Sequence, residues 1–482
     1  MTPLPEDRAR MRATFMRLFP GLSLVMAIAV ADNTLVATAL PTIAADLGNP
    51  ERVSLVVVAY MLAAMLAAPV YGLLGDLFGL RLVLFAALGL FTTGSLLCTL
   101  APSLPVLVVF RVLQGLGGGG LMVLAQALLS QAISPRERGR FQGYLASIVV
   151  CSQGLAPALG APLTAAFGWP AVFLLNLPLA ALSFVLLLRV PALPGRGGAF
   201  RLDIVGITLL ALTLSAAMSA LMALQDIARS DGLRLAASAC ATAVLIALLF
   251  RNQSRSSYPL IPIALLRNPT ILLSDLVAMA HGAFLVATIV LIPTLFRVRY
   301  GLTTAELGLT IMPMSLGMIV GASIIGNLVT RTGRTTIWGM VGMAIGAGLM
   351  FTAAALPCLT QGQMAAMLFG LGICSSTVMG PVQIMIATAA GREHLGSASA
   401  SVQFARILGT ALGTALTSAL LFLTLACSGV SETFVARLTS TAAGPVLWDP
   451  AIDIAFSAVF VLLGLFAASG GLLLSRISLT KV

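Results

Sequence analysis

Apolar residues fill long continuous stretches of this chain rather than alternating with polar ones. Glycine, proline and arginine clusters separate the stretches, and each is about twenty residues long, which a helix needs to span a bilayer. A membrane barrel would alternate apolar and polar residues over about ten positions. The pattern predicts an all-α membrane protein with about fourteen spans: 20–41, 53–73, 81–100, 104–130, 142–165, 170–189, 204–224, 235–250, 271–293, 305–328, 337–356, 363–388, 397–425 and 454–475.

Composition supports this prediction and excludes a soluble protein. Hydrophobic residues make up 59% of the 482, charged residues 9%, and the mean hydropathy is +1.05. A soluble domain carries about 25% charged residues. Hydrocarbon must therefore cover much of the surface, and only helices or closed barrels satisfy their backbone there.

The 27 basic residues are distributed as the positive-inside rule requires. With a cytosolic N-terminus, nineteen of the 27 fall on inside segments, six fall outside, and Arg111 and Arg406 lie within spans. Arg8 and Arg17 precede a full-length apolar run without a convincing cleavage site, so we expect an uncleaved first span. The prediction is a multi-pass protein of the cytoplasmic (inner) membrane with both termini cytosolic. The net charge of +11 then reflects topology and lipid contact, and we expect no nucleic-acid partner.

An internal repeat divides the chain. Gly72–Arg81 follows the second span and Gly326–Arg334 follows the tenth, each on a cytosolic turn. Repeated halves with a site between them are typical of transporters. The expected organisation is listed by residues: a cytosolic segment 1–19, a six-helix bundle 20–190, two linking transmembrane helices 204–250, a second six-helix bundle 271–475 and a cytosolic tail 476–482.

Five motifs carry a family resemblance. Gly72, Asp76, Gly79 and Arg81 fit G-x-x-x-D-x-x-G-x-[RK], and 107–117 fits L-x-x-x-R-x-x-Q-G-x-G around Arg111 and Gln114. Residues 32–41 are similar to D-x-T-[IL]-V-x-x-A-L-P. Residues 169–178 fit an outer-loop motif, W-x-x-x-F-x-x-N-x-P. The helix-5 antiporter motif, G-x-x-x-G-P-x-x-G-G, is degenerate: Pro157 and Gly160 match it, whereas Ser152, Ala156 and Ala161 replace three of its glycines.

Together, in this order and spacing, the motifs resemble the major facilitator superfamily, in particular its fourteen-helix drug:proton antiporters of the multidrug efflux type. The resemblance implies a secondary active transporter rather than an enzyme, driven by the proton gradient with no cofactor. It also implies a gating role for the loop and helix-5 motifs: Gly72, Asp76, Gly79, Arg81, Pro157 and Gly160.

Ionisable residues inside spans are costly to bury and are therefore candidate functional residues. Asp32 and Arg111 each lie about 10–14 Å below the outer boundary, at 1.5 Å per helical residue, so they are able to pair. A carboxylate that loses such a partner takes up a proton more readily, as proton coupling requires. The alternative is a static buried salt bridge.

Other candidates are weaker, and each has a structural alternative. Asp275 either lines the inward cavity or is an acid at the cytosolic interface. His281 either relays protons, because imidazole titrates near neutral pH, or is a packed neutral histidine. Arg406 either contacts substrate or ties helix ends to carbonyls. Asn33 and Gln114 complete the expected substrate or proton-relay residues. The run 117–120 is predicted to serve close helix packing rather than phosphate binding.

The preferred function is a proton-coupled antiporter that exports small lipophilic or amphiphilic compounds by alternating access. The partners are then a small-molecule substrate, protons and membrane lipids, and we expect a monomer. A dedicated exporter of an endogenous metabolite, lipid or siderophore is an alternative with the same mechanism. A non-transporting membrane sensor is a third, disfavoured because the chain has no sizeable soluble domain. The six cysteines show no C-x-x-C or metal spacing, so no metal is expected.

Overall fold

The computed structural model describes most of the chain as helix. The described residues are 5–48, 52–133, 144–145, 148–149, 151–152, 156, 159–160, 162–188, 195–197, 203–225, 232–256, 259–260, 263–300, 304–356, 360–428 and 450–477. Within these residues the regular elements are helical, which confirms the predicted fold class.

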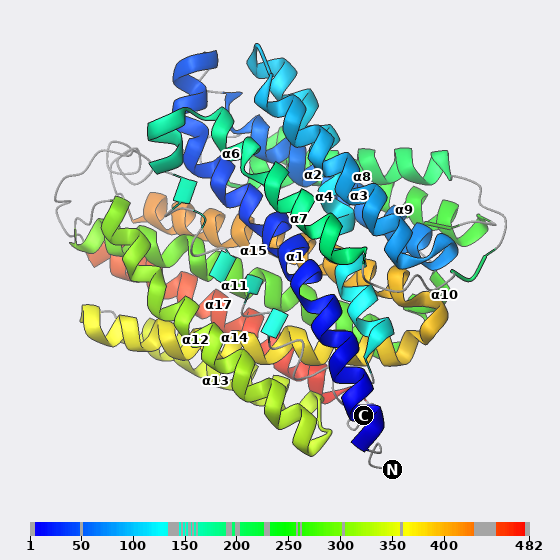
Figure 1. Ribbon diagram of the computed structural model, residues 1–482. Helices are drawn as coiled ribbons and strands as arrows, with labels where there is room; N and C mark the ends of the chain where they lie inside the picture. Colours follow the sequence, from blue (N-terminus) through cyan, green and yellow to red (C-terminus); the bar gives the residue numbers. More distant parts are fainter. Residues whose placement is uncertain are drawn as a thin grey trace. The chain divides into compact units, whose positions relative to one another are not determined.

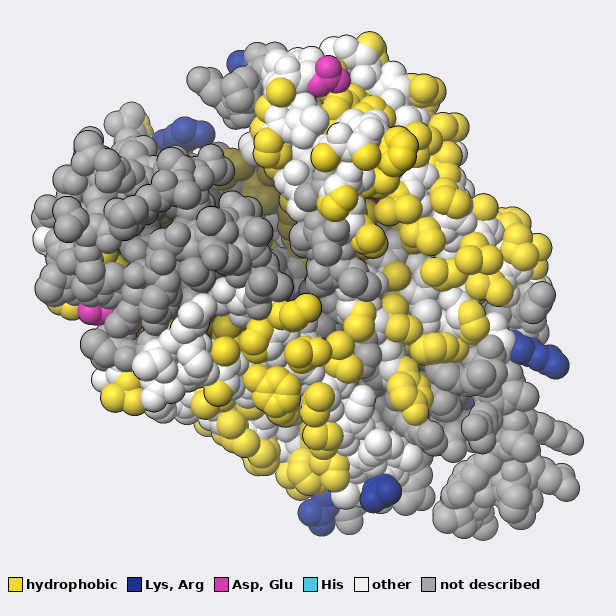
Figure 2. Space-filling view, turned by 60° about the vertical axis from the view of Figure 1, so that its left-hand side comes forward, with side chains coloured by type: hydrophobic (Ala, Val, Ile, Leu, Met, Phe, Trp, Pro, Cys, Tyr) yellow, Lys and Arg dark blue, Asp and Glu magenta, His cyan; other side chains and the backbone are white. Residues whose placement is uncertain are grey.

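Thirteen described helices are long and apolar enough to cross a membrane. Each overlaps one of the expected spans. The remaining expected span, 142–165, is described only in part, and its described residues are helical. Because of their length and composition, these helices confirm a multi-pass membrane protein. Figure 2 shows hydrophobic side chains over broad areas of the described surface, with few charged ones among them.

Two compact units divide the chain. The first contains residues 1–211, 252–271 and 386–404, and the second contains 212–251, 272–385 and 405–482. The division into bundles 20–190 and 271–475 with linking helices 204–250 follows other boundaries, and it stays a prediction.

The first unit is built from the N-terminal helices (Figure 1). They are α1 (Pro5–Leu47), α2 (Leu55–Phe78), α3 (Leu80–Thr99), α4 (Leu104–Ala132), α6 (Pro170–Leu174), α7 (Asn176–Leu187), the start of α8 (Ile204–Gln225), α10 (Ile263–Leu266), a 3-10 turn (Arg392–His394) and the first turns of α15 (Leu395–Cys427). Helix α1 begins well before the expected span at 20, because no glycine interrupts residues 5–20 and Pro20 is tolerated within the helix.

The second unit holds the rest of the long helices (Figure 1). They are the rest of α8, most of α9 (Gly232–Arg255), most of α11 (Pro269–Tyr300), α12 (Thr304–Thr332), α13 (Thr336–Ala355), most of α14 (Gln361–Ala390), the remainder of α15 and α17 (Pro450–Ser475). In this unit α13 packs against α17.

Close packing in the first unit depends on the glycines of α4. Helix α4 lies against both α2 and α3. A side chain at Gly117 would collide with the backbone of Phe91 on α3, and one at Gly119 would collide with the backbone of Ala64 on α2. Small residues allow this approach between membrane helices. The prediction that residues 117–120 serve helix packing is therefore confirmed.

The repeated turn motif also has a repeated backbone. Gly79 after α2 and Gly333 after α12 both have positive φ, +97° and +67°. Each donates its backbone N–H to the carbonyl four residues earlier, Gly75 and Val329, at 3.0 and 2.8 Å. Glycine adopts positive φ without the steric cost that a Cβ brings. The repeat in the sequence thus encodes the same helix ending twice.

Candidate functional site

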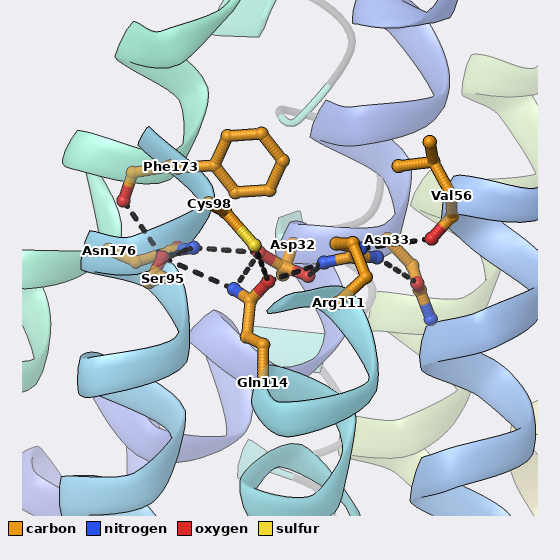
Figure 3. A network of polar contacts seen from close by, with 9 residues as sticks. All are labelled: Asp32, Asn33, Val56, Ser95, Cys98, Arg111, Gln114, Phe173 and Asn176. Carbon is orange, nitrogen blue, oxygen red and sulfur yellow. Dashed lines mark hydrogen bonds and ion pairs between the residues drawn. The ribbon is translucent and has the colours of Figure 1, made fainter. Parts of the chain in front are cut away.

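A polar cluster lies inside the first unit, centred on Asp32 of α1 (Figure 3). The Asp32 side chain is fully buried. Its partner is Arg111 on α4, whose Nη1 lies 2.6 Å from Asp32 Oδ2 as both a hydrogen bond and an ion pair. Arg111 is fully buried too, so neither charge is solvated by bulk water. The structure therefore contains the Asp32–Arg111 pair that the similar depth of the two residues in their spans had suggested.

Three of the four remaining N–H donors of Arg111 are also occupied. Its Nε donates to the backbone carbonyl of Val56 on α2 at 3.0 Å, and its Nη2 to Asn33 Oδ1 at 3.3 Å. Nη1 makes a second bond, to Gln114 Oε1, at 2.7 Å. A buried charge is tolerated only when it is paired and hydrogen-bonded in this way. The planar guanidinium thereby links three helices at one point.

Asp32 accepts two further bonds, both through Oδ1. Gln114 Nε2 donates at 2.9 Å and Asn176 Nδ2 donates at 2.7 Å. The same two amides also donate to Ser95 Oγ, at 3.2 and 3.0 Å, and Ser95 donates its own proton to the carbonyl of Phe173. Helices α1, α3, α4 and α7 each contribute one or more of these polar side chains (Figure 3).

Aromatic rings enclose the ion pair. The Arg111 guanidinium carbon lies 4.2 Å from the centroid of the Tyr60 ring and 5.8 Å from that of Phe173. Both rings are buried, and a cation over an aromatic face gains cation–π stabilisation when it is desolvated. The site is therefore a dry polar centre with apolar walls, where any change in charge has a large electrostatic effect.

A second polar contact joins the end of α2 to the start of α15, both within the first unit. Asp76 Oδ1 accepts the backbone N–H of Gly396 at 2.6 Å, and Oδ2 accepts the N–H and the hydroxyl of Ser397 at 2.9 and 2.6 Å. A carboxylate at a helix N-terminus satisfies free N–H groups and the helix dipole. We refer to Asp76, Gly396 and Ser397 as the α2–α15 latch.

The other residues of the loop motif surround this latch. Gly72 lies so close to α15 that a Cβ would stand 2.7 Å from Ala400 Cβ and from the Gly396 carbonyl oxygen. Arg81, at the start of α3, donates from Nη2 to the carbonyl of Leu188 at the end of α7, at 2.9 Å. The motif therefore ties α2, α3, α7 and the first turn of α15 together.

In the second unit, His281 of α11 is buried. Its Nε2 lies 2.8 Å from Ser375 Oγ and 3.0 Å from the Ser375 carbonyl oxygen on α14. This contact fits the packed, hydrogen-bonded alternative, although Nδ1 has no partner among the described residues. Asp275 is 7% exposed and Arg406 is half-buried on α15, and the two alternatives given for each stay predictions.

Within the described ranges, no group of three or more His, Cys, Asp or Glu side chains is arranged to hold a metal ion.

Comparison with known proteins identifies the family. The family model of the Major Facilitator Superfamily matches residues 22–414. This chain belongs to the Major Facilitator Superfamily. Membership confirms the resemblance drawn from the motifs and the prediction of a transporter rather than an enzyme.

Several relatives of this superfamily member carry transport names. Multidrug transporter protein MdtP of Bacillus subtilis is 28% identical over 412 residues, which cover 84% of this chain and 75% of MdtP. Uncharacterized transporter YebQ of Escherichia coli is 32% identical, covering 82% of this chain and 87% of YebQ. The chain spans 59% of the longer transporter Rv1877 of Mycobacterium tuberculosis. Among solved structures, the proton:xylose symporter XylE superposes with a TM-score of 0.65 at 14% identity, covering 97% of this chain and 96% of XylE.

For this facilitator, sequence reasoning found the two charges, Asn33 and Gln114 but missed other members of the site. Asn176 was expected in an outer loop, and the structure places it buried at the centre, bonded to Asp32. Ser95 and Tyr60 gave no signal, because single hydroxyls are common in membrane helices. Pro157 lies outside the described residues, whereas a Cβ at Gly160 would stand 2.5 Å from Thr38 Oγ1 of α1.

Replacing Gly72 with alanine tests the α2–α15 latch. The added methyl has no space, so we expect α2 and α15 to separate and the free energy of unfolding to fall by about 1–3 kcal/mol. Gly89→Ala on α3 is the matched control, since its Cβ would meet nothing within 4 Å. Melting temperatures of the purified proteins in detergent provide the measurement. Equal melting of the two variants would contradict the close approach.

Proposed function

We propose that this facilitator is a proton-coupled antiporter that exports small lipophilic or amphiphilic compounds, drugs among them, across the cytoplasmic membrane by alternating access. Relatives named as multidrug transporters and efflux pumps support the substrate class. The observation that carries the proton coupling is the fully buried ion pair of Asp32 and Arg111. The transporting unit in this proposal is a monomer.

The hydrogen bonds of the site allow Asp32 two protonation states. As a carboxylate it is held by Arg111, Gln114 and Asn176. After taking a proton it no longer pairs with Arg111, and its new O–H requires an acceptor. The Gln114 amide oxygen, already within the cluster, supplies one after a small rearrangement. Arg111 keeps its other acceptors, so neither state leaves a buried charge without partners.

In the proposed mechanism, the change in the charge of Asp32 drives alternating access. In the proposed cycle Asp32 takes a proton from the outside, and the loss of the ion pair loosens α1 against α4. Release of the proton to the cytosol restores the pair. The α2–α15 latch, with Gly79, Arg81, Pro157 and Gly160, is proposed to gate the cytosolic side. Asp275, His281 and Arg406 stay candidates for substrate or proton contact in the second unit.

Proteoliposomes test the proposed function directly. With purified protein and an acidic lumen, we expect uphill accumulation of a cationic dye in the lumen and a simultaneous rise of lumenal pH, because protons leave as dye enters. A protonophore should abolish dye accumulation, because it collapses the proton gradient whether or not dye is present. Assays with neutral and anionic dyes would then define the substrate charge. Dye accumulation that survives the protonophore and follows a sodium gradient would contradict proton coupling.

The proposed topology gives an independent prediction. Both termini should be cytosolic, and residues 428–452 should lie outside, because of the arginine distribution. A fluorescent protein that matures only in the cytosol, fused after Lys481, should be bright. Alkaline phosphatase fused at the same place should be inactive, and its activity there would overturn the orientation.

A further inference from the structure

An apolar groove opens on the first unit away from the Asp32 site. It has a cavity volume of about 850 Å³ and is lined by α2, α3, α4 and α8. The lining residues are Leu66, Ala67, Val70, Tyr71, Leu74, Phe78, Leu82, Val83, Phe85, Ala86, Leu90, Leu116 and Ile207. Phe78 and Leu82 are 48% and 65% exposed, so one end of the groove is open to the surroundings.

The lining carries almost no hydrogen-bonding capacity. Tyr71 contributes the only polar side-chain group among the thirteen lining residues. Sites for drug-like molecules have similar volumes, about 300–1,000 Å³, but include several placed polar groups that fix the ligand. A hydrocarbon chain needs no such groups. The groove is therefore better suited to an acyl chain than to a polar substrate.

A cation stands at the surface end of the same groove. The Arg81 guanidinium carbon lies 5.3 Å from the centroid of the Phe85 ring, which lines the groove. Arg81 donates from Nη2 to Leu188, but its buried Nε–H has no acceptor within the described part of the chain. A guanidinium with uncommitted donors suits a phosphate, which it is able to bind through two parallel hydrogen bonds.

We propose that this groove is a binding site for one anionic phospholipid, with an acyl chain along α2 and α3 and the phosphate on Arg81. This lipid site goes beyond the proposed transport function. It depends on that proposal only for the membrane orientation, which places Arg81 at the cytosolic leaflet. Anionic lipids are concentrated in that leaflet, and a nearby arginine attracts them. Bound lipid would fill the space between α8 and the α2–α3 pair.

Native mass spectrometry of the full-length protein in detergent tests the site. The probes are phosphatidylglycerol and phosphatidylcholine with identical acyl chains, so only the headgroup charge differs. We expect one phosphatidylglycerol to be retained about fivefold more than phosphatidylcholine, the factor expected for one arginine near an anionic headgroup. Arg81→Gln should abolish the preference, and Ala86→Phe, which fills the groove, should reduce retention of both lipids.

Matched variants on α9 serve as controls. Ala241 and Arg255 are exposed there, so Ala241→Phe and Arg255→Gln should leave lipid retention unchanged. If Ala86→Phe does not fold, Leu82→Trp at the exposed rim provides the same test. Equal retention of the two lipids by the wild type, or unchanged retention in both groove variants, would overturn the proposal. Neither result would bear on proton coupling, which is argued from the Asp32–Arg111 pair and not from lipid binding in the groove.

Discussion

Replacing Asp32 with asparagine is expected to abolish uphill export while the protein still folds and reaches the membrane. Asparagine keeps the size and the hydrogen-bonding capacity of the side chain but does not titrate. The new side-chain amide brings N–H donors where the carboxylate had only acceptors. Rotation of the Gln114 amide is able to turn its oxygen toward them, as in the protonated state proposed above. Dye export driven by an imposed pH gradient should fall to the level of protein-free liposomes, whereas binding of neutral compounds should persist.

Asp46→Asn is the control for this experiment. Asp46 lies on the same helix, is exposed, and accepts a hydrogen bond from Trp169 Nε1 at 2.7 Å. Its replacement should leave export and its pH dependence unchanged. Uphill export by Asp32→Asn with an unchanged pH dependence would rule out Asp32 as the coupling residue. Asp275 and His281 would then be the next candidates.

Removing the cation should be more damaging to the fold than removing the acid. Arg111→Ala leaves the Asp32 carboxylate buried without a counter-ion and removes the side-chain donor to the Val56 carbonyl. Breaking a buried pair from one side typically costs about 3–5 kcal/mol. We expect low expression and a marked fall in melting temperature in detergent.

A double variant separates charge from packing. Asp32→Asn with Arg111→Gln removes both charges and leaves neutral groups that hydrogen-bond. If the loss in Arg111→Ala comes from the uncompensated charge, the double variant should be the more stable of the two, because neutral replacement of a buried pair is often tolerated. A double variant as unstable as Arg111→Ala would mean that packing of the guanidinium against Tyr60 dominates.

Much of the fold was predictable because membrane helices have a simple physical signature. Continuous apolar runs located the spans, and the asymmetry of arginine gave an orientation. Asp32 and Arg111 were found because charges within spans are rare and costly. Asn176 was not found from the sequence. It follows the short helix α6, which ends near the expected outer surface, and only the packing of α7 places it beside Asp32.

The sequence alone did not reveal which residues far apart in the chain contact one another. The motif singled out Asp76, yet its acceptor role toward Gly396 and Ser397 joins residues 320 and 321 positions apart. Nothing local to either segment specifies this pairing. The rotation of each helix about its axis decides which neutral side chains meet, as for Ser95 with Gln114, and a single sequence does not give that rotation.

The separation of Asp32 from its partners along the chain has a consequence during synthesis. Arg111 follows 79 residues later, and Asn176 follows after 144. At about 5–20 residues per second, the ribosome adds Arg111 roughly 4–16 s after Asp32. The first helix therefore enters the bilayer with a lone acid, and its apolar side chains must secure insertion before the counter-charge exists. Substitutions that make this helix less apolar should thus lower the yield of inserted protein before they affect transport.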